Sequence, residues 1–467
     1  MAEILRVGVT TPIALMDPRT AFDFVNSLVY WHLYQKPFRP TGGADGATEP
    51  VLFTGPLEPI STKAYTARVR PDLRFSDGTA LDATRLAKSL RASREMYGEA
   101  HIRVDGDRLH FTLRRPHRRF DCLLSHQTCA VVYRRDGQLF GSGPYVVASS
   151  GPDGVRLSRN ERYSPRPAIP EIEFTVYPPA ADGRPRRLMA ALERGHVDFS
   201  LSLSRDDLSE VQGVHKWMGQ GDSTAYLYFN VAHPGLGDRA VRRALAKAID
   251  RRALAAASYA SPRAFAASGP VPPSVAKMDD DLATDPPAAR AELDRLGRPA
   301  GPLRMLVVSM ARPHLPHPLT TAERLADQLA AVGVEVEVSP TRDIADYLRR
   351  VSAGDYDLAL SGWIPESPDL AALLEAVFSE RAIADSPEGA IVGANLARWR
   401  HPSMEAALER YREDPTADAL AAINRLVNVE RPLVPLLYGS QVVVHSWRVR
   451  DRPKSYFNRP FFTEMRL

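Results

Sequence analysis

The sequence has few cysteines, no long apolar run and no strong excess of charge. Its 467 residues include only two cysteines, so it cannot hold the disulfide framework typical of small secreted proteins. No stretch of about 18 apolar residues occurs, and this absence argues against a transmembrane helix. The formal net charge is +4, with arginines spread along the chain, which argues against a nucleic-acid partner.

The motifs of common enzymes are also absent. The chain has no G-x-S-x-G elbow, no H-E-x-x-H helix and no G-x-x-x-x-G-K-[ST] loop. Cys122, His126 and Cys129 form C-x3-H-x2-C, which lacks a fourth zinc ligand. We interpret both cysteines as partly buried thiols, while a disulfide between them stays open for an exported protein. The sequence therefore predicts no catalytic residue, no metal site and no cofactor.

The N-terminus lacks the features of an export signal. Met1-Ala2-Glu3 leads directly into a predicted strand, without a charged segment, an apolar segment or a cleavage site. As written, the sequence predicts a cytoplasmic protein. A periplasmic or cell-surface location is expected instead if a signal sequence has been removed.

The stretch 64–90 carries the clearest local pattern. Apolar and polar side chains alternate over residues 64–70, and this period of two predicts a half-buried strand. Asp77-Gly78 predicts a tight turn. Asp82 then precedes an amphipathic helical pattern, so its carboxylate can cap the free amides at the start of a helix. Taken alone, such an α/β unit indicates no particular function.

A second region, residues 303–363, alternates strand and helix patterns. This order predicts a parallel sheet with helices on both faces. Ligands of such sheets bind beyond the carboxyl ends of the strands, so the loop after Leu360 should reach a ligand site. Proline-rich residues 270–287 predict a connector without regular structure. Strands are expected at 303–310, 334–339 and 356–363, and helices at 321–333 and 343–354.

Five segments follow one another in an order typical of one family. They are LRVGVTTPIALMDP at 5–18, the stretch 64–90, GSGPY at 141–145, YLYFNVAHPGLGDRAVRRALAKA at 226–248 and GDYDLALSGWIPESPD at 354–369. Together they resemble the oligopeptide- and dipeptide-binding family, the extracellular solute-binding proteins of family 5 that serve peptide and nickel ABC importers. The resemblance covers nearly the whole chain.

The resemblance implies an α/β, two-lobed periplasmic-binding-protein-like fold with an extra α/β subdomain and strands that cross between the lobes around a ligand cleft. It implies that the protein captures a peptide or peptide-like, amine-bearing small molecule by cleft closure, for an ABC importer. Lobe I would comprise 1–45, 141–232 and 438–467, with 46–140 as the inserted subdomain and 233–437 as lobe II.

The resemblance also suggests ligand-binding residues in the loop that follows residue 360. Glu366 matches the acid that pairs with the ligand's α-amine in peptide-binding relatives, and such a pair would be a strong charge-assisted hydrogen bond. The family usually has Asp there, so the match is weaker for a standard peptide, and a solvated glutamate is the alternative. Trp363 could stack on a peptide plane or hold a cation, or could pack in the core. Asp369 is expected to cap a helix starting at residue 370.

Other ligand-binding candidates lie at strand ends and on the first helix. Thr10 and Thr11 follow the first strand, where hydroxyl and backbone groups can meet a carboxylate or an amide. Trp31 lies on the first helix, with core packing as the alternative. Arg312 and His314 follow the strand at 303–310, on the ligand side by the same rule.

Two other classes of function stay open. A homologue without a signal peptide could be a biosynthetic enzyme on this fold, or a cytoplasmic ligand sensor, although the helix-turn-helix of related regulators is missing. The expected partners are a small-molecule or peptide ligand and, in an importer, a permease. We expect no nucleic acid and a monomer.

Overall fold

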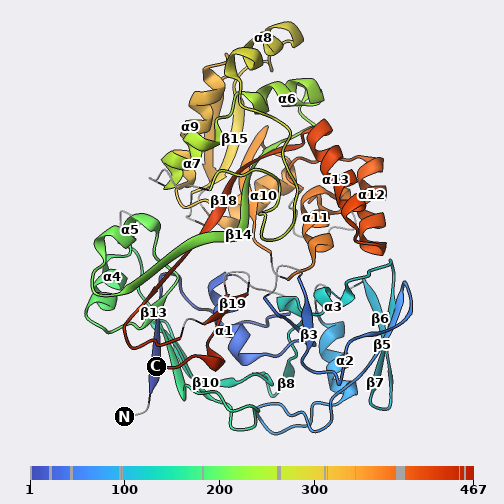
Figure 1. The fold of residues 1–467 in the computed structure, drawn as a ribbon, viewed down its shortest axis with the longest axis vertical. Coiled ribbons are helices and arrows are strands. Elements are labelled where there is room, and N and C mark those ends of the chain that lie inside the picture. The colour runs from blue at the N-terminus through green and yellow to red at the C-terminus, as the bar shows by residue number, and fades with distance from the viewer. Residues whose placement is uncertain are drawn as a thin grey trace. The chain divides into compact units, whose positions relative to one another are not determined.

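The computed structural model divides into two compact units. Unit 1 contains residues 1–219, 366–369 and 441–467, and unit 2 contains residues 220–365 and 370–440. Each unit has its own strands, helices and hydrophobic cores (Figure 1). The structure describes residues 3–467 except 20–23, 43–45, 94–95, 97, 181–183, 260–264, 310–311, 313, 342, 366, 385–394, 452 and 457–458.

The large sheet of unit 1 is built around β1 (Ile4–Val9), whose alternating sequence buries Leu5 and Val7. β1 runs parallel to β12, with Ile4 opposite Glu171. The strand order in this unit is β10-β11-β12-β1-β13-β18. The bounds are β10 (Tyr145–Gly151), β11 (Gly154–Arg159), β12 (Glu171–Val176), β13 (Phe199–Ser200) and β18 (Leu433–His445), of which only 441–445 belong to unit 1.

The first helix, α1 (Phe24–Leu33), holds the C-terminal segment of the chain in unit 1. The buried His32 accepts the backbone N–H of Phe462 at 3.0 Å through Nε2. Arg459 donates from Nε to the Ser27 hydroxyl at 2.7 Å. The other elements here are α4 (Arg186–Glu193), α5 (Arg205–Glu210), β19 (Lys454–Tyr456), β20 (Arg459–Phe461) and η4 (Phe462–Glu464).

A separate four-stranded antiparallel sheet with the order β4-β5-β7-β6 also belongs to unit 1. The predicted strand is β5 (Ala64–Arg68), and Gly78 has φ +91° in the predicted turn. The Asp82 carboxylate accepts the Arg85 backbone N–H at 2.8 Å, so the predicted helix cap is confirmed. The bounds are β4 (Glu58–Ser61), β6 (Ala100–Asp105), β7 (Arg108–Leu113), α2 (Ala83–Arg91) and α3 (Phe120–Leu123). Shorter elements are β2 (Phe38–Pro40), β3 (Thr48–Pro50), η1 (Gln127–Cys129), β8 (Tyr133–Arg135) and β9 (Gln138–Phe140).

Unit 2 contains a mixed sheet with the order β18-β14-β17-β15-β16. β15 runs parallel to both β16 and β17, as predicted, whereas β17 is antiparallel to β14. The strand β14 (His215–Phe229) contributes 215–219 to unit 1 and 220–229 to unit 2, so β14 and β18 each belong to both units. The other bounds are β15 (Leu303–Val308), β16 (Val336–Thr341) and β17 (Leu358–Trp363).

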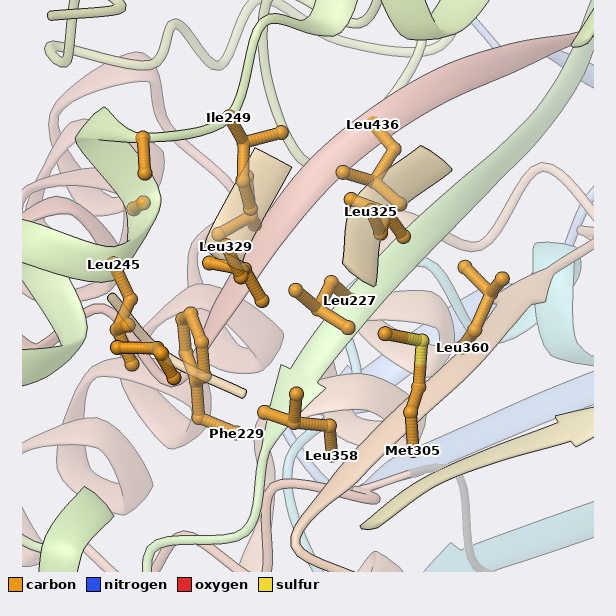
Figure 2. Close-up of a cluster of buried hydrophobic side chains, with 14 of the residues drawn as sticks. Leu227, Phe229, Leu245, Ile249, Met305, Leu325, Leu329, Leu358, Leu360 and Leu436 are labelled. Atoms are coloured by element: carbon orange, nitrogen blue, oxygen red, sulfur yellow. The ribbon is translucent and has the colours of Figure 1, made fainter. Parts of the chain in front are cut away.

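Helices cover both faces of this sheet, because alternate strand residues point to opposite sides. Leu227 and Phe229 of β14 contribute to one core, whereas Tyr226 and Tyr228 contribute to the other. Figure 2 shows the first core, in which side chains of α9 lie with those of β14, β15 and β17. The helices are α6 (Arg239–Lys247), α7 (Arg251–Tyr259), α8 (Pro286–Leu296), α9 (Pro318–Ala330), α10 (Ile344–Ala353), α11 (Leu370–Phe378), α12 (Pro402–Glu413) and α13 (Ala417–Glu430), with η2 (Pro234–Leu236) and η3 (Glu380–Ala382).

One expectation about local structure needs correction. The connector predicted over 270–287 ends earlier, because α8 begins at Pro286. The Asp285 carboxylate accepts the Ala288 backbone N–H at 3.0 Å and caps this helix. Two prolines at the start of α8 are tolerated, since the first amides of a helix have no intrahelical acceptor.

Candidate ligand-binding site

The candidate site of unit 2 lies at the carboxyl ends of two parallel strands. β15 ends at Val308 and β17 ends at Trp363, and Val307 lies opposite Leu360 in their register. The loops that follow both strands therefore leave the same edge of the sheet. This is the edge at which sheets of this kind bind ligands.

Arg312 follows β15 and has no carboxylate partner in the described part of the chain. Burial lowers the pKa of its guanidinium, and the hydroxyl of Tyr347 acts in the opposite direction. Tyr347 comes from α10 and donates to the Ser361 hydroxyl of β17 at 3.0 Å. Arg312 is partly buried, and a partly desolvated cation without an anion is costly, so an anionic group of a ligand would be favourable here.

His314 lies two residues further along the same loop and is only 1% exposed. Burial lowers its pKa to about 3, and the positive charge of Arg312 acts in the same direction. Neither ring nitrogen has a hydrogen-bond partner in the described structure. The ring is therefore neutral and offers both a donor and an acceptor.

The approach of His314 to the sheet depends on Gly362. A Cβ atom added at Gly362 would lie 2.7 Å from Nε2 of His314, and it would also collide with the Thr224 carbonyl oxygen. Only glycine leaves room for this contact. Sequence reasoning placed both residues near the site but missed that they touch, because the contact depends on the path of the loop.

Trp363 and Glu366 come from the loop that the resemblance singled out. Trp363 lies opposite Thr224 at the end of β17 and is half-buried against the second core of unit 2. Glu366 lies outside the described residues, so its predicted contact with an amine stays a prediction. The alternative of core packing for Trp363 is supported by its position.

The candidates of unit 1 lie apart from one another in the sequence. Thr10 is half-buried and Thr11 is exposed, and both directly follow β1. Trp31 is 5% exposed and clusters with Phe461. The Lys36 ammonium lies 3.4 Å from the centre of a Trp31 ring, so a cation already occupies one face of this indole.

A short segment around Asp369 belongs to unit 1, although unit 2 precedes and follows it in the chain. The carboxylate of Asp369 lies 2.9 Å from Nε2 of His117, and both side chains are almost fully buried. The backbone N–H of Asp369 donates to the Ser367 hydroxyl at 3.3 Å. The sequence predicted only a cap on α11 for Asp369, and it carried no signal for the partner His117.

The other sequence features have structural roles. Cys122 and Cys129 are both thiols outside any disulfide and are fully buried, and burial raises the pKa of the Cys122 thiol. A Cβ atom added at Gly143 would lie 2.6 Å from the Leu33 carbonyl oxygen, so the GSG segment at 141–143 is a close-packed turn. No group of three or more His, Cys, Asp or Glu residues could hold a metal in the searched part of the structure.

Comparison with known proteins decides the family. Residues 48–385 match the model of the bacterial extracellular solute-binding proteins, family 5. The chain belongs to this family. The resemblance expected from the five ordered segments is therefore confirmed.

This family 5 protein is similar to curated relatives over about two thirds of its length. It is 27% identical over 344 residues to the probable ABC transporter periplasmic-binding protein SapA of Escherichia coli K12, covering 70% of this chain and 59% of SapA. It is 28% identical over 315 residues to di/tripeptide-binding protein 4 of Pseudomonas aeruginosa UCBPP-PA14, covering 65% of this chain and 57% of the relative. The matched region thus spans less than two thirds of either relative.

The fold of the family 5 protein is also that of solved relatives. The structure of a dipeptide binding protein from Pseudoalteromonas sp. SM9913 in complex with Met-Leu matches 99% of this chain and 100% of its own, with a TM-score of 0.84 at 17% identity. The expected fold class is confirmed. None of the helices in the described part of the chain has the length and apolar composition that crossing a membrane requires.

Proposed function

We propose that this protein captures a peptide or a peptide-like small molecule that carries both an amine and an anionic group, and delivers it to an ABC importer. The observation that carries the proposal is Arg312, a partly buried guanidinium without a carboxylate partner in the described structure, at the ligand edge of the unit 2 sheet. A ligand carboxylate would pair with it. Glu366 would hold the amine, as the resemblance implies.

The printed names of relatives support this substrate class. They include di/tripeptide-binding proteins and a glutathione-binding protein, whose ligands carry amines and carboxylates. By the same analogy we assign the protein to the periplasm, with a permease as its partner and a monomer as the working form. The five-segment division into lobe I, the inserted subdomain and lobe II also belongs to this proposal.

Peptides blocked at either end test the proposal. We would screen di- and tripeptides and glutathione by thermal shift, and then measure the best ligand by calorimetry beside its N-acetylated and C-amidated forms. We expect each blocked form to bind at least tenfold more weakly, because one charged partner is lost. Equal affinity of free and blocked forms would overturn the assignment, and so would the absence of any ligand.

A further inference from the structure

Asp222 is a carboxylate of unit 2 that has no cationic partner among the described residues. It lies on β14 and is partly buried. The Ser274 hydroxyl donates to Oδ1 of Asp222 at 3.0 Å. Burial raises the pKa of Asp222, and this hydrogen bond acts in the opposite direction. A shielded carboxylate without a cation is costly, so a positively charged group of a ligand would be favourable beside it.

The register of the sheet places Asp222 at the edge where the candidate ligand site lies. Thr224 pairs with Trp363, the last residue of β17, and the two strands are antiparallel. Asp222 comes two residues before Thr224, so it lies level with the residues that follow β17. Side chains two apart on a strand share a face, and so do directly opposite residues. Asp222 and Trp363 are therefore diagonal neighbours on one face, roughly 7–8 Å apart along the backbone.

The same face of the sheet leads to Arg312. Tyr226, four residues after Asp222 on β14, belongs to the second core of unit 2, as does Tyr347. Ser361 lies opposite Tyr226 and accepts the Tyr347 hydroxyl at 3.0 Å. Tyr347 in turn interacts electrostatically with Arg312. One face and one edge of the sheet thus carry a carboxylate and a guanidinium, each without an oppositely charged partner among the described residues.

The spacing of the two charges fits a short peptide. β17 separates β14 from β15, and Arg312 lies in the loop that follows β15. Neighbouring strands are about 4.8 Å apart, so Asp222 and the end of β15 are roughly 10 Å apart across the sheet. An extended peptide spans at most about 3.3–3.6 Å per residue. The two ends of a dipeptide or tripeptide can therefore reach both side chains.

We propose that Asp222 binds the ammonium group of the peptide ligand, an inference that rests on the proposed function. The ammonium would donate charge-assisted hydrogen bonds to the carboxylate, which offsets the loss of water around both groups. Trp363, partly buried beside Asp222, offers an aromatic face to the same cation. Asp222 is then a second acid for the amine, in addition to Glu366, and the ligand class is a peptide of two or three residues with a free amine.

Calorimetry of Asp222→Asn with free and N-acetylated peptides tests the assignment. The probes are Met-Leu, Ala-Ala-Ala and glutathione, and the one that binds the parent most tightly is compared with its N-acetylated form. We expect Asp222→Asn to bind the free peptide at least about tenfold more weakly than the parent and the acetylated peptide like the parent. Asp418→Asn, which changes an exposed acid of α13, is the matched control and should bind both forms like the parent.

Ser274→Ala separates ligand binding from a structural role of Asp222. This variant removes the hydroxyl that donates to Asp222 but keeps the carboxylate, so it should bind the free peptide more tightly than the acetylated form, as the parent does. Titration of the Asp222 carboxyl carbon by nuclear magnetic resonance in the parent gives a second readout. The free peptide should lower the pKa of Asp222, because an ammonium favours the charged carboxylate, and the acetylated peptide should not.

Four results would overturn the role of Asp222 alone: unchanged affinity of Asp222→Asn for the free peptide, an equal loss for both peptide forms, loss of the preference for the free amine in Ser274→Ala, or a pKa of Asp222 that the free peptide leaves unchanged. A different result marks failure of the proposed function. If the parent binds the free and acetylated forms equally, or binds none of the three probes, the proposed function is wrong and the inference falls with it.

Discussion

At the scale of single residues, the proposed function rests on a charged and a neutral side chain that are shielded from water. Arg312 is partly buried without a carboxylate partner among the described residues, and burial keeps His314, two residues further on, neutral. A site with this arrangement favours an anion over a cation. A ligand anion would offset the cost of removing the Arg312 cation from water, and this gain would favour binding.

Replacing Arg312 by methionine should weaken binding of the best peptide ligand by roughly 2–5 kcal/mol, because the ligand carboxylate would lose its charged partner. The melting temperature without ligand should not fall, since a partly buried cation without a carboxylate partner among the described residues is removed. Calorimetry measures the ligand affinity, and thermal denaturation measures the melting temperature. Arg324→Met, on the exposed face of α9, is the control. Unchanged affinity in Arg312→Met would exclude the assigned role.

Glu366→Gln should weaken binding of the same ligand by roughly 2–5 kcal/mol, because the free amine loses its negative partner. Binding of the N-acetylated ligand, which has no free amine, should not change. Glu335→Gln, at an exposed position of unit 2, is the control. Calorimetry with the free and the N-acetylated ligand shows whether the loss of affinity depends on the amine. An equal loss for the two forms would show that Glu366 does not bind the amine.

Acid should destabilise the fold through the buried His32. Burial lowers the pKa of His32 from an ordinary 6.5 to about 4, so the unfolded chain takes up the proton first as the pH falls. The neutral histidine therefore stabilises the fold above pH 6.5, and this contribution is lost between pH 6.5 and 4, by about 3 kcal/mol. Urea unfolding at pH 7, 5.5 and 4.5 measures how the free energy of unfolding falls with pH. This decrease should be smaller in His32→Leu than in the parent, and His101→Gln should show the same decrease as the parent.

At the scale of elements, local patterns predicted the alternation of strands and helices over residues 303–363 of unit 2. The helix expected at 343–354 is α10, with Asp343 as its cap and Gly354 in the left-handed conformation at its end. Such signals act over a few residues, so a sequence reveals them. The edge of the sheet that binds ligand was also predictable, from strand order alone.

Contacts between distant segments were not predictable. The pair of His117 and Asp369 joins residues far apart in the chain, and no local pattern specifies it. The packing of His314 on Gly362 likewise depends on how a proline-rich loop turns back. The start of α8 was missed because prolines, which usually break helices, are accepted in the first turn.

Gly362→Ala tests how closely β17 and the loop after β15 pack. The added methyl group would meet both His314 and the Thr224 carbonyl oxygen, so we expect a loss of about 1–3 kcal/mol in stability and weaker ligand binding. Gly55→Ala is the control, since no atom lies within 4 Å of its added Cβ. Urea denaturation and calorimetry measure the effects. A fully stable Gly362→Ala variant would contradict the packing.

At the scale of the whole molecule, two units with separate cores share two long strands. β14 and β18 each pass from one unit into the other, so a rotation of the units would bend these strands and leave the cores within each unit intact. We therefore expect ligand to change the relation between the units more than their internal structure.

Small-angle scattering should show a smaller radius of gyration when the best peptide ligand is added. The physical reason is the closure that the family resemblance implies. Arg312→Met at the same peptide concentration should keep the radius of the free protein. An identical radius with and without ligand in the parent would contradict closure.

Residues 441–467 complete unit 1, and this affects the order in which the two units can fold. Phe462 binds His32 and Arg459 binds Ser27, so the first helix meets its partners only after nearly the whole chain has been translated. Unit 2 is encoded almost without interruption between residues 220 and 440. Unit 2 can therefore fold from a nearly continuous segment, whereas unit 1, although its residues come first, also needs residues 441–467.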